Sequence, residues 1–559
     1  MIAFSTFLVI LSSVITLIYL FVRHKFSYWK NKNVPYPKPH FLLGNYAEYI
    51  LLKQSLNEKS VDICKQFPNE PIIGTYFGLE PKLIVQDPEL IKLIFTKDFY
   101  YFSSRELSTH GHKETATKNM FFAYGDEWKV LRQNMTPLFS SAKMKNMFHL
   151  VQSCTKQFEK LLDEETKVSN EIEIRTLMAR FTMDCICSCA FGVDAEVMGK
   201  EISNNPFRKI ADVIHDVSDY RGFTIVARIL WPTLFYGLGF KLIPEESSQF
   251  FDTLLRNVFE TRNGVPSPRQ DFVDLFMTLK NNKYITGDAI KNLIETGANT
   301  KASLEADDSL LVSQCFMIFA AGFDTSSSTA AFTLYEIAKH PDVQEKVHAE
   351  VDAYWQANNG QINYECVNQL PYLYQCIEEA LRLYPVLGIS TREMYDNYTL
   401  PNGVTLEKGT GIYIPVYHLQ RDPKYFPEPE KFRPERFSPE ERSNITPYTY
   451  IPFGEGPRIC IGMRFAKMLM MPGLVTIFSK YRVELAAGTL TTPTLEPKSI
   501  ATSFRGGVHL KLTKLKPTYN YTYNGRGELF CNPCNQKFTT KKGFSSHIRA
   551  HRRRSPTSP

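Results

Sequence analysis

The sequence predicts a mainly α-helical body with a minor β region, preceded by one transmembrane helix and followed by a small ββα module. Three observations support this fold class: long amphipathic segments fill the middle of the chain, an uncharged apolar segment begins it, and paired cysteines and histidines end it. Hydrophobic residues make up 43% and charged residues 22% of the 559 residues. This globular composition excludes a disordered chain, and the single long apolar terminus excludes a multi-span transporter.

The first segment has the properties of a membrane anchor. Residues 2–22 carry no charge, and a helix of this length spans about 30 Å, the thickness of a bilayer core. Arg23 and Lys25 follow at once, so we expect the N-terminus in the lumen and the body in the cytosol. A cleaved signal peptide would need a basic start and a small-residue cleavage site, so we expect an uncleaved anchor over residues 1–25. Proline spacing predicts a semi-rigid hinge over residues 26–40.

The body, residues 41–516, is predicted from its hydrophobic periodicity. Helical spacing covers residues 128–165 and 309–340, and the second segment is apolar nearly all round, so it should run through the core. Short strand-like runs punctuated by Pro and Gly occur near residues 72–86 and 397–415. We therefore expect a large helical body with a minor sheet.

The most specific pattern is F-x-x-G-x-R-x-C-x-G, formed by Phe453, Gly456, Arg458, Cys460 and Gly462. The glycines permit a turn and a close backbone approach to a flat, bulky group. Cys460 directly precedes an apparent helix, whose N-terminal amides and dipole favour a thiolate. The alternative is an inert, buried cysteine in a glycine loop.

Through this loop the chain resembles the cytochrome P450 family of haem-thiolate monooxygenases, over about residues 30–515. The sequences around KFSYWKNKNVPYPKP and SFRGGVHLKL are similar to those of the microsomal, insect family-6 branch. The resemblance implies the cytochrome P450 fold and haem b (iron protoporphyrin IX), with Cys460 as the axial iron ligand. The other cofactor-binding residues that it implies are Trp128, Arg132, Arg392, Phe453, Arg458 and Gly462. Trp128 and Arg132, four positions apart, share a helix face and carry donors suited to a propionate.

Glu379 and Arg382 lie three positions apart and can form an ion pair on one helix face. Taken alone, the pair is as easily a surface ion pair. The resemblance implies that Arg436, in a Pro-Glu-Arg-Phe segment, completes a buried Glu–Arg–Arg network with a structural role beside the haem.

A polar interruption in the apolar 309–340 segment points to proton delivery. The run Ala321-Gly322-Phe323-Asp324-Thr325 resembles the family's oxygen-activation motif, in which Asp324 and Thr325 are the catalytic residues. We expect the Thr325 hydroxyl to open the helix hydrogen bonds locally and make room for dioxygen. A solvated Asp beside a back-bonding Thr is the alternative. The pair also favours a monooxygenase over a haem-thiolate isomerase, a third interpretation that does not need it.

The resemblance also implies partners and a location. Electrons from NADPH would arrive through NADPH–cytochrome P450 reductase, with cytochrome b5 as a second candidate partner, at a basic patch that includes Lys129, Arg464 and Lys467. Those three residues could equally be a solvated face. The substrate would be an apolar molecule delivered by the membrane, such as a plant toxin or an insecticide, or alternatively an endogenous hormone or lipid. We expect the enzyme on the cytosolic face of the endoplasmic reticulum membrane.

The tail does not resemble the family. Residues 517–559 contain eight basic residues and one acidic residue, which account for the whole net charge of +7. Residues 517–528 are expected to be a linker. In residues 529–559 the spacing C-x2-C-x12-H-x3-H predicts a two-Cys two-His zinc finger, with zinc on Cys531, Cys534, His547 and His551. Specific nucleic-acid binding is not expected, because one finger reads about three base pairs. The tail is either a joined neighbouring coding segment or a binding module tethered to the oxidase body.

Overall fold

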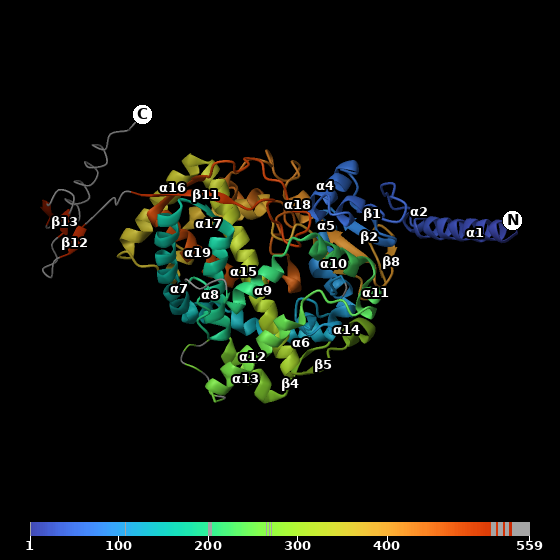
Figure 1. Cartoon of the computed structure of the whole chain (residues 1–559), viewed down its shortest axis with the longest axis horizontal. Helices are drawn as coiled ribbons and strands as arrows, with labels where there is room; N and C mark the ends of the chain where they lie inside the picture. Colours follow the sequence, from blue (N-terminus) through green and yellow to red (C-terminus); the bar gives the residue numbers. More distant parts are fainter. Residues whose placement is uncertain are drawn as a thin grey trace.

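The computed structural model describes residues 2–515 apart from 107, 200–203, 264, 266, 268 and 270, together with 521–523, 529–531 and 536–538. Helices dominate the body, and α1 projects from it at the N-terminus (Figure 1). The helices are α1 Ile2–Lys25, α2 Tyr28–Asn31, α3 Ala47–Ile50, α4 Leu56–Gln66, α5 Pro88–Lys92, α6 Gly125–Met135, α7 Ser141–Val168, α8 Ile174–Ile186, α9 Pro206–Ile214, α10 Asp219–Leu230, α11 Pro232–Gly237, α12 Glu245–Thr261, α13 Val273–Asn282, α14 Lys291–Thr296, α15 Asp308–Lys339, α16 Pro341–Ala357, α17 Pro371–Leu383, α18 Val416–Leu419 and α19 Met463–Lys480.

The minor β region consists of small sheets. The strands are β1 Ile72–Phe77, β2 Glu80–Val85, β3 Glu171–Glu173, β4 Tyr284–Asp288, β5 Lys301–Glu305, β6 Ser390–Glu393, β7 Tyr398–Thr399, β8 Thr405–Leu406, β9 Gly411–Ile414, β10 Tyr481–Leu485, β11 His509–Lys514, β12 Tyr521–Tyr523, β13 Leu529–Cys531 and β14 Gln536–Phe538. The four-stranded sheet has the order β1-β2-β9-β6, with β2 and β9 parallel and the outer pairs antiparallel. Strands β1, β2 and β9 fall in the two regions predicted from the Pro- and Gly-punctuated runs, whereas β6 lies just before the second region.

Helix α15 is the core helix of the body, as its apolar sequence predicts. It lies against α8, α12 and α17 and is buried over most of its length. The helix begins where the Asp307 carboxylate accepts a hydrogen bond from the Leu310 N–H at 2.7 Å, a typical N-cap. It ends at His340, directly before Pro341, where the backbone of the preceding residue is disfavoured from helical geometry.

The single helix expected over residues 128–165 is instead two helices. α6 ends at Met135, a short 3-10 turn spans Thr136–Phe139, and α7 begins at Ser141. Pro137 explains the difference, because its ring cannot continue a regular helix and its nitrogen carries no hydrogen. The break lets α6, which carries Trp128 and Arg132, run in its own direction.

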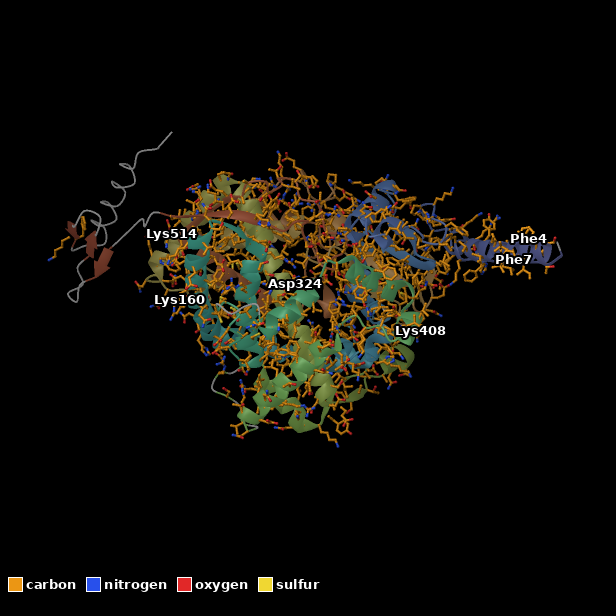
Figure 2. All side chains as sticks on the ribbon, in the orientation of Figure 1. Phe4, Phe7, Lys160, Asp324, Lys408 and Lys514 are labelled. Atoms are coloured by element: carbon orange, nitrogen blue, oxygen red, sulfur yellow. The ribbon has the colours of Figure 1, made fainter. Side chains whose placement is uncertain are left out.

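The N-terminal helix carries exposed apolar side chains, including Phe4 and Phe7, which stand out from α1 in Figure 2. It is long and apolar enough to cross a membrane, and α15, which passes the same test, is mostly buried inside the body. Directly after α1, the Trp29 side chain is fully buried and donates a hydrogen bond from Nε1 to the Thr75 carbonyl at 2.9 Å. The expected hinge therefore begins as a segment docked on β1.

Three short strands follow the body. β12, β13 and β14 pair antiparallel in that order. β12 lies inside the expected linker 517–528, since the Tyr-Thr-Tyr run favours strand geometry. Cys531 closes β13, whereas the predicted zinc ligands Cys534, His547 and His551 lie outside the described residues.

Candidate active site

The cysteine loop precedes α19 and is held by its own backbone. The Cys460 N–H donates to the Phe453 carbonyl at 2.9 Å, and Gly462 is the residue before the first turn of α19. Gly456 has a φ of +70°, and a Cβ on it would lie 1.8 Å from the Phe95 carbonyl oxygen. Only glycine fits there, because an added methyl group would collide with backbone that cannot move aside. The glycine thus allows the cysteine loop to approach the short helical segment Leu93–Lys97 closely, which sets the position of Cys460.

The Cys460 side chain is accessible although it is enclosed by protein. Cys460 is exposed, whereas the eight other cysteines of the body, residues 41–516, are buried. Burial nevertheless raises the pKa of its thiol, while the Gly462 N–H and the charges of Arg132 and Arg105 act to lower it. We infer an internal cavity at this sulfur, because its accessible surface lies in a desolvated place. The net effect is a raised pKa of the Cys460 thiol. The thiolate that we expect at this helix terminus therefore needs a further positive charge at the sulfur, such as a metal cation.

Helix α15 contributes a second accessible point inside the body. Ala321 is exposed, although the residues of this helix before and after the motif are mostly buried. Gly322 is packed against α8, where a Cβ would lie 2.7 Å from Ile186 Cδ1. The glycine therefore allows two helices to approach closely. Because the Ala321 side chain is small, the part of the cavity that it lines is free of bulky groups.

Four arginines from separate parts of the chain gather beside Cys460. They are Arg105, Arg132 of α6, Arg392 of β6 and Arg458 of the cysteine loop. Burial lowers the pKa of each, and their mutual repulsion adds to this: Arg458 is affected by the charges of the other three. The Arg458 guanidinium also lies 4.6 Å from the centre of the Trp128 ring. Such a cluster of buried like charges is stable only with an anion among them.

The hydrogen bonds of this cluster are incomplete within the described chain. Arg458 donates to the carbonyls of Phe121 and Ala123, yet its Nε is buried without a partner. Arg392 donates to the Thr391 carbonyl at 2.8 Å, and its Nε is likewise without a partner. Unpaired buried donors beside an accessible thiol fit a flat group that carries an iron and two carboxylates. The residues present therefore fit haem.

Arg105 is the one member of this cluster that sequence reasoning missed. Its guanidinium lies 3.9 Å from the centre of the Phe121 ring, and its charge acts on both Cys460 and Arg458. It stands in the segment Phe-Ser-Ser-Arg-Glu, which has no spacing that points to an anion. The weak signal available was an arginine that directly follows the largely aromatic, uncharged residues 99–104.

Asp324 is held away from Thr325 by a separate polar cluster. Its Oδ1 lies 2.9 Å from Arg175 Nη2 and 3.3 Å from His215 Nε2. Arg175 begins α8 and also hydrogen-bonds His215, which follows α9. Burial lowers the pKa of His215, partly offset by the charge of Asp324. Figure 2 shows Asp324 in the middle of the body. These partners were not predicted.

Thr325 does not interrupt the helix. Its Oγ1 donates to the Ala321 carbonyl at 2.7 Å, and α15 is continuous through this position. The expected local opening is therefore absent from α15, because the hydroxyl back-bonds to the preceding turn. The bond nevertheless places the hydroxyl next to the accessible Ala321.

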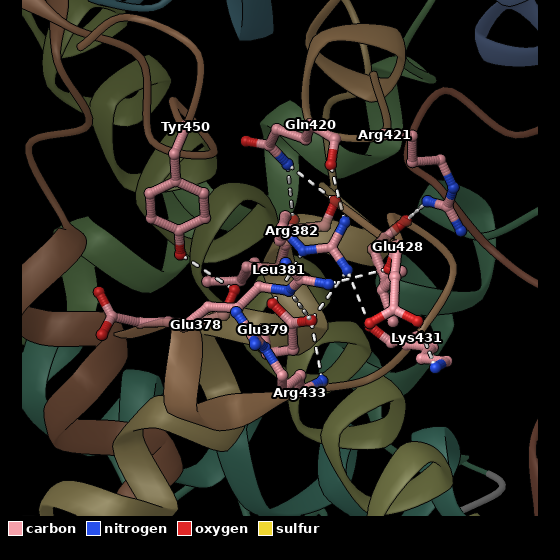
Figure 3. A network of polar contacts seen from close by, with 12 residues as sticks. Glu378, Glu379, Leu381, Arg382, Gln420, Arg421, Glu428, Lys431, Arg433 and Tyr450 are labelled. Carbon is pink, nitrogen blue, oxygen red and sulfur yellow. Dashed lines mark hydrogen bonds and ion pairs between the residues drawn. The ribbon is translucent and has the colours of Figure 1, made fainter. Parts of the chain in front are cut away.

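The structure brings Glu379, Arg382 and Arg436 together. Glu379 and Arg382 are fully buried, and the carboxylate accepts from Arg382 Nε and Nη2, both at 2.8 Å. Arg436 Nε lies 3.3 Å from Glu379 Oε1, and the Arg433 N–H donates to the same oxygen at 3.0 Å. In Figure 3 the Glu379 carboxylate lies between the guanidinium groups and the Arg433 backbone.

This network leads to the cysteine loop. Arg382 Nη1 donates to the Gln420 carbonyl at 2.8 Å, and Gln420 Oε1 accepts from the Ile451 N–H at 3.1 Å. Ile451 stands two residues before Phe453, whose carbonyl holds the Cys460 N–H. The buried carboxylate therefore braces the loop that presents the thiol, through the contact between Arg382 and Gln420 that Figure 3 shows.

Comparison with known proteins gives a consistent set of relatives. A family model described as Cytochrome P450 matches residues 34–509. Cytochrome P450 6B2 of Helicoverpa armigera is 34% identical over 508 residues, covering 91% of this chain and 98% of that protein. Cytochrome P450 6B5 of Papilio glaucus is 36% identical over 487 residues, covering 87% and 99%. Cytochrome P450 6k1 of Blattella germanica is 33% identical over 510 residues, covering 91% and 97%. The family match ends before the basic tail.

Proposed function

This chain belongs to the cytochrome P450 family of haem monooxygenases, and on that premise we propose that it inserts one oxygen atom from O2 into apolar small molecules, chiefly xenobiotics. The observation that carries the proposal is the accessible Cys460 thiol inside the body, beside a cluster of four arginines in which Arg392 and Arg458 each keep a buried Nε without a hydrogen-bond partner. The test is to incubate the full chain with reductase, NADPH and labelled O2. One labelled oxygen atom per product molecule is the expected result, and label found only in water contradicts it.

We assign the haem contacts as follows. Cys460 would hold the haem iron through its sulfur, Arg458, Arg392, Arg132 and Trp128 would donate to the propionates, and Phe453 and Gly462 would shape the loop. When bound, the haem supplies the site for O2 and the oxidising power that side chains lack. Arg105 joins the propionate contacts, because its buried charge belongs to the same cluster.

Asp324 and Thr325 are proposed to move protons. Thr325 Oγ1 holds its proton toward the Ala321 carbonyl at 2.7 Å and so keeps a hydroxyl at the cavity wall. Asp324, paired with Arg175 and His215, adjoins that residue, and its carboxylate can refill the hydroxyl after taking up a proton from solvent. Transfer requires the Asp324 carboxylate to leave its ion pair with Arg175, so this pair controls the supply of protons. An isomerase would not need such a relay.

Electrons are proposed to come from NADPH through cytochrome P450 reductase, with cytochrome b5 as a second donor. Of the basic patch expected for docking, Lys129 lies over the Tyr100 ring at 5.7 Å and Arg464 is exposed. Lys467 lies 3.5 Å from the centre of the Tyr374 ring, and burial lowers its pKa. We therefore propose that Arg464 and Lys129, rather than Lys467, contact the reductase. Charge reversal at Arg464 is expected to raise the reductase concentration needed for half-maximal rate.

The apolar helix α1 supports a membrane location. Its last turn carries Arg23, His24 and Lys25, which favours the cytosol for the body. We propose residence on the cytosolic face of the endoplasmic reticulum. Protease added to intact microsomes should remove the body, and protection of the body would contradict this orientation.

The tail is proposed to be dispensable for oxidation. The family match ends at residue 509, which supports a catalytic domain close to residues 41–516 and a separate segment from 517 onward. The predicted zinc ligands would make the tail a zinc-binding module if it is translated. Deletion of residues 517–559 should leave turnover unchanged and remove any bound zinc. Loss of turnover would instead favour a functional role of the tail in the oxidase, and transcript sequencing would test the joined-segment explanation.

A further inference from the structure

Behind the cysteine site, the segment before α6 is fastened to the helices α10 and α11. Glu114 is 3% exposed, and its carboxylate accepts from the Tyr236 hydroxyl at 2.8 Å. It also accepts from the N–H groups of Leu242 and Ile243 at 3.0 and 2.9 Å. Three donors satisfy this buried carboxylate. Glu114 is thus a fixed acceptor that orients Tyr236.

Arg228 of α10 is the cation of the same cluster, and its charge is not paired directly. Arg228 is 5% exposed, and its Nε donates to the Tyr236 hydroxyl at 2.6 Å. Its guanidinium lies 5.5 Å from the centre of the Phe122 ring and 5.7 Å from that of Tyr236. Nη2 is buried without a hydrogen-bond partner, and among the described residues no carboxylate lies within 4.0 Å of the guanidinium. A buried cation in this state is costly unless something else binds it.

Phe122 connects Arg228 to the active site. The Phe122 ring is half-buried and packs edge-on against Phe121 at 5.0 Å, and the Phe121 carbonyl accepts from Arg458. On the other side of this turn, the Met120 N–H donates to Gln314 Oε1 on α15 at 3.0 Å. Gln314 is two helical turns before the accessible Ala321, or about 10 Å. Arg228 is therefore linked through Phe122 and Phe121 to the turn that contacts both Arg458 and α15.

We propose that Arg228 binds the carboxylate of an apolar, carboxylate-bearing substrate, a class that the xenobiotic assignment alone does not name. The Tyr236–Glu114 pair fixes the Nε edge of the guanidinium and leaves its Nη2 group for a ligand. A carboxylate fits a guanidinium better than a neutral oxygen does, since it can accept two bonds and neutralise the charge. Phe122 offers an apolar surface beside it. The inference rests on the proposed function, because it places the ligand between Arg228 and the oxidation site.

The test compares two ligands of equal length, dodecanoate and methyl dodecanoate, on the full chain carrying haem. Optical titration of the haem band and calorimetry both measure the dissociation constant. We expect wild type to bind the acid at least tenfold more tightly than the ester, since charged hydrogen bonds are worth about 1.5–3 kcal/mol. Arg228→Met should weaken the acid about tenfold and leave the ester within about twofold. Arg228→Lys should retain part of the preference.

The matched control is Arg221→Met on the same helix. Arg221 is also buried, and its guanidinium donates to the Leu242 carbonyl, so this variant removes a buried cation without touching the Nη2 group of Arg228. Its acid-to-ester ratio should equal that of wild type. Equal affinity of wild type for acid and ester, or an equal loss of both in Arg228→Met, overturns the assignment. Calorimetry separates this proposal from the proposed oxidase function, because it does not need the haem band. If the chain lacks a haem band but still prefers the acid, and Arg228→Met removes that preference, the oxidase function alone is overturned.

Discussion

Removal of the Glu379 carboxylate is expected to cost the protein its haem as well as much of its stability. Glu379 is fully buried and accepts bonds from Arg382, Arg436 and the Arg433 N–H. Breaking a buried ion pair costs about 3–5 kcal/mol, and leaving a buried backbone donor unpaired adds about 1–3 kcal/mol. Domains are stable by only about 5–15 kcal/mol, so Glu379→Ala should consume a large part of the free energy of unfolding.

The loss of haem follows from the path between this network and the thiol. Without Glu379, the Arg382 guanidinium is no longer fixed against the Gln420 carbonyl, and Gln420 in turn holds Ile451 of the cysteine loop. Haem content by the pyridine assay and urea unfolding followed by circular dichroism measure the two effects. The control is Glu441→Ala, since Glu441 pairs with Arg433 at 2.7 Å with both side chains at least 40% exposed. A surface pair is worth about 0–1 kcal/mol, so this variant should resemble wild type. Normal haem content and an unchanged urea midpoint in Glu379→Ala would refute the reasoning.

Three further predictions follow from the site and the core. Thr325→Ala removes the hydroxyl at the cavity wall, so the amount of product formed per NADPH consumed should fall several-fold. Thr325→Ser should preserve this ratio, and an equal ratio in both variants contradicts the relay. Arg458→Leu removes a cation stacked on Trp128, so haem should transfer to apomyoglobin faster from this variant than from wild type. An unchanged rate of transfer argues against propionate binding by Arg458. Burial lowers the pKa of His348, so below about pH 6.5 the unfolded chain takes up a proton that the native chain resists. Stability is therefore complete above that pH and falls as the pH drops through the lowered native pKa, and His348→Gln should flatten Tm between about pH 7.5 and 5.5.

The parts predictable from sequence are those in which local spacing dictates geometry. Glu379 and Arg382 are three positions apart on a helix, so their contact follows from helical geometry alone. The apolar stretch of α15 predicts burial because it is hydrophobic nearly all round. The turn at Cys460 follows similarly from its glycines.

The parts that sequence reasoning missed depend on tertiary contacts. Arg175 meets Asp324 across 149 residues, and no pattern in either segment announces the pair. Arg105 joins the arginine cluster beside Cys460 only because its segment folds next to the cysteine loop. The break between α6 and α7 is different, since Pro137 was visible in the sequence and its effect on the helix was overlooked.

The central claim is that Cys460 is the thiolate ligand of a bound haem, and the carbon monoxide difference spectrum tests it most directly. The full chain, purified with haem and reduced, should give the red-shifted carbon monoxide band of a thiolate-ligated iron. Cys460→Ser should lose that band, and Cys366→Ser, at a buried cysteine away from the loop, should keep it. A thiolate-type band that survives in Cys460→Ser, or its absence from wild type that binds haem, would contradict the account.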